Sequence, residues 1–198
     1  NYKNLKEPNF HYTIASRLDY KNIYAQFSNL MIPIDFTEIS MRNNLAPAIS
    51  VFIESNLFTK LKISSLLSVA TQLPSLDQMS KTMFKNFVIT IPTKNLKTEN
   101  DLSLKLMLSL DVTENIKIYS HSMCTYMYNY IMLKKGYLNG VDTLNFSGYI
   151  YDVAVFANNK SALMIGNSTG LNFKQQLWSE ESFIVSSVNF SISKGFNL

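Results

Sequence analysis

The residues best suited to chemistry in this sequence of 198 residues are a single cysteine and two histidines. Cys124 follows His121 by three positions, a spacing that puts both side chains on one face of a helix. A metal site or a nucleophilic site needs further ligands or an orienting partner, and the sequence supplies none here. We therefore interpret Cys124 as a buried, inert thiol and His121 as a partly exposed helix residue. His11 falls in an irregular N-terminal part.

The carboxylates do not form an evident acid/base pair. Glu180 and Glu181 are adjacent, so on a helix or a strand they point in different directions, and we interpret them as a solvated turn. Asp152 interrupts an apolar strand pattern. We favour an outward-facing residue of an alternating strand, with an ion pair between subunits as the alternative.

Glycine-rich and serine motifs of known enzymes are also missing. The segment Gly166–Gly170 lacks the lysine and the spacing of a phosphate-binding loop. No serine has the neighbours of a nucleophile elbow. We predict no catalytic, cofactor-binding or metal-binding residue and no cofactor, and we expect a protein that is not an enzyme.

The composition favours assembly. Hydrophobic residues make up 46% of the chain and charged residues 16%, whereas a typical soluble domain has about a quarter charged residues. A surface poor in charge tolerates burial against neighbouring molecules, because little desolvation cost opposes it. The alternative source of this bias is an AT-rich genome, since lysine far outnumbers arginine (Arg17 and Arg42).

Charge and hydropathy argue against two other classes of partner. The net charge is +4, but the positive residues are scattered, whereas a nucleic-acid surface gathers them on one face. No apolar run approaches the roughly 20 residues that span a bilayer as a helix. We therefore expect no membrane span.

Most of the chain carries strand patterns. Leucine occupies every second position from Leu102 to Leu110, which places all five leucines on one face of a strand. Further strands are predicted at 57–67, 87–91 and 182–193. A hairpin is predicted from strands at 149–156 and 162–165 around Asn158-Asn159-Lys160, because asparagine tolerates positive φ. Residues 70–77 and 166–170 are predicted loops.

One helix is predicted, at about 112–135. Asp111 can cap it and Glu114 stands three positions later, as in a capping box. Apolar residues recur at spacings of three and four. Lys134 and Lys135 suit the negative end of the helix dipole, and Gly136 suits its C-terminal cap.

The order of these elements from residue 57 onward resembles the tail-tube proteins of long-tailed bacteriophages. The resemblance includes the strand that leads to Ala70-Thr-Gln-Leu-Pro74 and the strand 102–110 that runs directly into the helix. It also includes the hairpin around Asn158-Asn159 and the closing strand 183–192. The match covers about two thirds of the chain, in order and pattern, and residues 1–50 have no counterpart in it. The positive net charge departs from that family's tendency towards a negative lumen.

The resemblance implies a fold class that is mainly β with one α-helix (α+β), an antiparallel β-sandwich or barrel of tail-tube type. It implies an N-terminal arm or extension at 1–50 and a β domain at 51–198. Subunits would form hexameric rings in a virion assembled in the host cytoplasm, as a tail tube or an adjacent baseplate or tail-end ring. Other virion structural proteins would be partners, and DNA would pass through the channel without specific binding. Ring closure pairs edge strands that would otherwise promote aggregation.

Two alternatives remain at this point. One is a β-sandwich subunit of a viral capsid or shell, and the other is a monomeric β-rich binding module. The helix at 112–135 discriminates between them, because a jelly roll does not need it and the tube fold does. Extended backbone at those residues would remove the main reason for preferring the tube.

Overall fold

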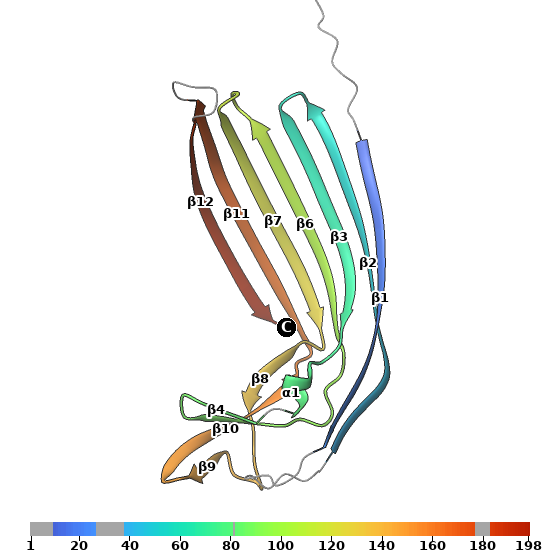
Figure 1. Ribbon diagram of the computed structural model, residues 1–198, viewed down its shortest axis with the longest axis vertical. Coiled ribbons are helices and arrows are strands. Elements are labelled where there is room, and N and C mark those ends of the chain that lie inside the picture. Colours follow the sequence, from blue (N-terminus) through green and yellow to red (C-terminus); the bar gives the residue numbers. More distant parts are fainter. Residues whose placement is uncertain (1–9, 27–37, 81, 177–182) are drawn as a thin grey trace, which may run out of the picture.

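The computed structural model describes residues 10–26, 38–80, 82–176 and 183–198 (Figure 1). Most of the described chain is strand, and both sheets are built mainly from antiparallel pairs. The prediction of a mainly β protein with antiparallel sheets is therefore confirmed.

A sheet of seven long strands makes up most of the molecule, in the order β1-β2-β3-β6-β7-β11-β12. Every neighbouring pair in it is antiparallel. The strands are β1 (Phe10–Gln26), β2 (Glu38–Phe58), β3 (Leu61–Gln72), β6 (Glu99–Asp111), β7 (Ile116–Tyr128), β11 (Ser161–Gln176) and β12 (Phe183–Asn197).

The connections between these strands differ at the two ends of the sheet (Figure 1). At one end the described connections are short, residues 59–60 between β2 and β3 and residues 112–115 between β6 and β7. At the other end, residues 73–98 and 129–160 leave the sheet and build a separate structure. One end of the large sheet therefore has tight turns, and the other end carries the separate structure built by the two long connections.

The two long connections form a small second sheet, in the order β4-β5-β10-β8, with β9 paired to β10. Its strands are β4 (Met83–Lys85), β5 (Val88–Ile91), β8 (Ile131–Lys135), β9 (Thr143–Phe146) and β10 (Tyr149–Asn158). β5 and β10 run parallel, and each comes from a different connection. The small sheet therefore joins segments that are far apart in the sequence.

The short helix α1 (Leu76–Ser80) also belongs to this end of the molecule. Its start is a reciprocal cap: the Gln78 backbone N–H donates to Ser75 Oγ at 3.1 Å, and the Ser75 backbone N–H donates to Gln78 Oε1 at 2.8 Å. Met79 of α1 is buried against Ile23 of β1 and Leu96. The helix thus attaches the small sheet to the edge of the large one.

The buried apolar side chains gather in the small sheet and where it meets the large sheet. One cluster contains Ile89, Ile91, Leu138 and Val153, and the other contains Ile23, Met79 and Leu96. Away from this junction, the large sheet has no layer packed on either face in the part of the chain described. Its long strands therefore lack a hydrophobic core of their own.

The helix predicted at 112–135 is wrong. Residues 116–128 form β7 and residues 131–135 form β8, with a turn between them. β7 pairs along its length with β6 and with β11. These two ladders satisfy the backbone on both sides of β7, and that long-range pairing outweighs a helical spacing of apolar residues.

Other predictions also differ from the structure. The strands that flank Asn158-Asn159 do not form a hairpin, because β10 lies in the small sheet and β11 in the large one. The predicted loop 166–170 lies inside β11. Residues 10–26 and 38–50, expected in an arm, belong to β1 and β2 of the large sheet, and the expected boundary at residue 50 falls within β2.

Candidate functional site

The sequence's candidate nucleophile and its neighbouring histidine lie on opposite faces of the large sheet. His121 and Cys124 are both in β7, and an odd separation along a strand sends side chains to different sides. Cys124 is exposed, so the prediction of a buried thiol is wrong. The two residues do not form a common site.

The other candidates are also dispersed. His11 lies on the edge strand β1, opposite Glu54 of β2. Asp152 of β10 is exposed. The pair Glu180 and Glu181 lies outside the described residues. Among the residues described, no three His, Cys, Asp or Glu side chains lie close enough to hold a metal ion.

The arrangement that stands out is the division of the large sheet into two unlike faces. The strand registers place apolar side chains from all seven strands on one side, which we call the apolar face. They include Tyr12, Ile14, Leu18, Ile49, Val51, Ile53, Ile63, Leu67, Val69, Leu102, Leu104, Leu106, Leu108, Leu110, Ile118, Tyr126, Leu163, Ile165, Leu171, Val188, Phe190 and Ile192. Within the described pairings, Lys194 on the edge strand β12 is the one charged residue on this face.

The opposite side, which we call the polar face, carries the remaining charges of these ladders. They include Arg17, Asp19, Lys21, Glu54, Lys62, Glu99, Asp101, Lys105, Asp111, Lys117 and Lys174. Serine, alanine, asparagine, methionine, glycine and threonine fill most of the positions between them. The sheet is therefore divided by polarity along its whole width.

Exposure on the two faces is the reverse of the pattern in a water-soluble protein. The β6 leucines of the apolar face are 40–47% exposed. The intervening polar-face residues Ser103, Met107 and Ser109 are half-buried, and Ser64 of the polar face is only 5% exposed. Large apolar side chains are thus more open to the surroundings than the small polar ones behind them.

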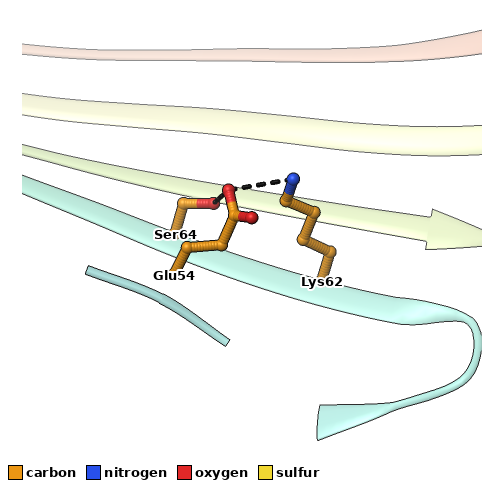
Figure 2. Close-up of polar contacts among 3 residues, drawn as sticks. All are labelled: Glu54, Lys62 and Ser64. Carbon is orange, nitrogen blue, oxygen red and sulfur yellow. Dashed lines mark hydrogen bonds and ion pairs between the residues drawn. The ribbon is translucent and has the colours of Figure 1, made fainter. Parts of the chain in front are cut away.

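The polar face pairs most of its described charges internally. Figure 2 shows Glu54 of β2, which forms an ion pair with Lys62 Nζ at 2.9 Å and accepts a hydrogen bond from Ser64 Oγ at 3.4 Å. Similar pairs join Lys117 to Asp111 and Arg17 to Asp19. Such pairing keeps the charges of this face mutually compensated.

A small group of uncharged polar residues interrupts the apolar face on β7 and β11. Asn167 Nδ2 donates to Ser122 Oγ at 2.9 Å and to Ser120 Oγ at 3.1 Å. Thr169 Oγ1 donates to Asn167 Oδ1 at 2.9 Å. These groups satisfy one another, which lowers the cost of placing them among apolar neighbours.

In the small sheet, Lys135 Nζ lies 2.6 Å from Asp142 Oδ2. The hydrogen bond and charge of Asp142 raise the pKa of Lys135, and those of Lys135 lower the pKa of Asp142. Both groups are exposed to solvent, so the pair contributes little to stability.

Sequence reasoning missed the apolar face as a whole, although it identified the strand that shows it best. The same alternation is present in β2 as Ile49, Val51 and Ile53, and in β3 as Leu67 and Val69. Comparing the phase of these alternations would have revealed the common face only once the strand order was known.

None of the described helices is long and apolar enough to cross a membrane. No protein-family model matches the chain, and no curated protein matches its sequence.

Proposed function

We propose that the large sheet is a membrane-embedded wall, with its apolar face against lipid acyl chains and its polar face towards water. This proposal departs from the expectation of no membrane span, which rested on the length of apolar runs in helices. The role is structural and does not involve catalysis. The observation that carries the proposal is the reversed exposure of the two faces. Apolar side chains from seven strands are uncovered, whereas small polar residues of the inner strands, such as Ser64, Ser103 and Ser109, are better covered.

The length of the apolar series suits a bilayer. From Leu102 to Leu110, β6 presents leucine at every second position, which is about nine residues or roughly 27 Å along the strand. A tilted strand crosses the hydrocarbon layer with about 9–11 residues. The β6 series therefore has the length required to span it.

Features at the two ends of the sheet also fit strands that cross a bilayer. Tyr126, Tyr128 and Phe196 lie on the apolar face near the small sheet, and aromatic rings are enriched where a membrane meets water. Short turns at one end and long connections at the other are typical of proteins whose strands cross a membrane.

The edges of the sheet imply neighbours. In the described chain, β1 and β12 each pair on one side only, and unpaired backbone groups are costly in lipid. Further strands, from more of the same polypeptide or from other copies, would pair these edges. The polar faces of such strands would together line a water-filled passage.

The single cysteine provides a direct test. Cys124 lies on the apolar face, opposite Leu104 of β6 and Ile165 of β11. A nitroxide attached to Cys124 in lipid vesicles should collide mainly with oxygen, which concentrates in acyl chains, and little with a water-soluble nickel chelate.

The matched control uses the polar face of the neighbouring strand. Ser103→Cys in a Cys124→Ser background places the label behind the sheet, where the nickel chelate should reach it. Equal access of the chelate to both positions would overturn the proposal.

A second candidate keeps the expectation of self-assembly in a virion ring or tube. It is favoured by the two open edges and by the lack of a core in the large sheet, which copies of the chain could supply. The helix on which the tail-tube resemblance depended is absent, because residues 116–128 form β7, so the support now comes from the open edges and the missing core. Sixfold rings in negative-stain images of lipid-free protein, with Cys124 shielded from both reagents, would favour this candidate.

A further inference from the structure

A hollow of about 350 Å³ opens over the middle of β11 on the polar face. Two rows of the ladder line it, one through Lys105, Met123 and Gly166 and the next through Met107 and His121. Its volume is at the lower end of the range for small-molecule sites. It does not belong to the apolar face described above.

Gly166 creates the floor of this hollow. A Cβ atom at this position would lie 3.2 Å from Met123 Cε and 3.4 Å from Ser193 Cβ. Glycine weakens the interior of a strand and often marks a place where a ligand or another backbone approaches closely. The missing side chain thus leaves room between Met123 and β12.

The charge around the hollow is unbalanced. Lys105 lines it and, among the described residues, has no ion-pair partner, whereas Lys62 and Lys117 of the same face do. No carboxylate is among the residues that line the hollow. Serine hydroxyls add hydrogen-bond donors, and Ser191 Oγ donates to Ser168 Oγ at 2.8 Å.

We propose that this hollow binds a small organic monoanion, a short aliphatic carboxylate. The ammonium group of Lys105 and the serine hydroxyls receive the carboxylate, because charge-assisted hydrogen bonds are the strong ones. Met107 and Met123 contact the aliphatic part, and methionine adapts well to such ligands. One unpaired cation matches one negative charge. Binding requires only that a ligand can reach the polar face from water. The proposal therefore does not depend on whether the opposite face meets lipid.

The test uses the whole chain in detergent, labelled with ¹³C at the methionine methyl groups. Adding butanoate should shift the methyl signals of Met107 and Met123 in a saturable manner. Met79 and Met83, in the part of the chain that carries the small sheet, should not respond. Butanol and butylammonium should bind much more weakly, since they lack the anionic group.

Two lysine variants separate this site from general attraction of anions to a basic protein. Lys105→Gln should weaken butanoate binding about tenfold or more, the loss expected for one hydrogen bond to a charged group. Lys117→Gln, which removes a lysine already paired with Asp111, should leave the affinity unchanged. An equal effect of both variants, or no saturable shift with butanoate, would overturn the inference. Failure of the lipid test with Cys124 would leave it standing.

Discussion

Replacing Leu104 by lysine tests what covers the apolar face. Leu104 is 42% exposed and faces Leu67 of β3 and Cys124 of β7. If the face meets water, the cost is about 1 kcal/mol at most, the range of strand propensities. If the face lies in the middle of a bilayer, lysine costs about 2–4 kcal/mol. The two environments thus differ by at least about 1 kcal/mol, roughly fivefold or more in the unfolding equilibrium.

The matched control is Ser103→Lys, which adds the same charge one residue earlier on the polar face. Both variants and the unaltered chain would be reconstituted in vesicles and unfolded with urea, with the far-ultraviolet circular dichroism of the strands as the signal. We expect Leu104→Lys to lower the midpoint strongly and Ser103→Lys to change it little.

Equal midpoints for the two variants would refute the reasoning, because they would show that the two faces meet the same medium. A loss confined to Leu104→Lys in lipid-free protein, together with smaller particles in light scattering, would identify copies of the chain as the covering layer.

Three further outcomes can be measured on the same material. Gly170→Val should lower thermal stability clearly, since a Cβ there meets an aromatic ring 2.6 Å away, whereas Gly195→Val has nothing within 4 Å and should be nearly neutral. Asn158→Ala should speed hydrogen exchange in the long connections, because its side chain bonds backbone groups of both of them at 2.6–3.0 Å. The lowered pKa of Asp142 means that its pairing with Lys135 stabilises the fold above the ordinary aspartate value of 3.8 and loses this effect as pH falls through the lowered pKa. The small difference in urea midpoint between the unaltered chain and Asp142→Asn should therefore be present at neutral pH and vanish in strong acid.

Strands with a single clear alternation could be predicted from the sequence. The leucines of β6 and the apolar series Ile184, Val188, Phe190 and Ile192 of β12 each lie on one face, as their spacing indicates. Each pattern is complete within one strand. Neither pattern predicts what covers the apolar side of its strand, because that depends on how the strands are arranged.

The helix prediction failed because β7 has apolar residues on both faces. Ile118 and Tyr126 lie on the apolar face, while Tyr119, Met123 and Met127 lie on the polar face. Mixed in sequence, the two sets give spacings of three and four that imitate a helix. The polar face accepts these residues because glycines lie beside two of them, with Gly166 opposite Met123 and Gly170 opposite Tyr119.

The glycines of β11 misled the loop prediction for the same reason. Gly166 and Gly170 are usual in loops, but here they provide space for side chains of β7. The failed hairpin has a different cause. Asn158 and Asn159 do lie at a turn, but the chain changes sheets there, and no local signal reports that change.

The parallel pairing of β5 with β10 places Val88 opposite Asp152, so the chain must close a long loop before this ladder exists. Loop closure on that scale is slow relative to adjacent hairpins. In the seven-stranded sheet, β3 pairs with β6 and β7 with β11 across one long connection each, and the other pairs are sequential neighbours. The small sheet needs both long connections at once. The small sheet should therefore form last. Because it holds the two long connections together, a protease cut within either connection should also loosen the other.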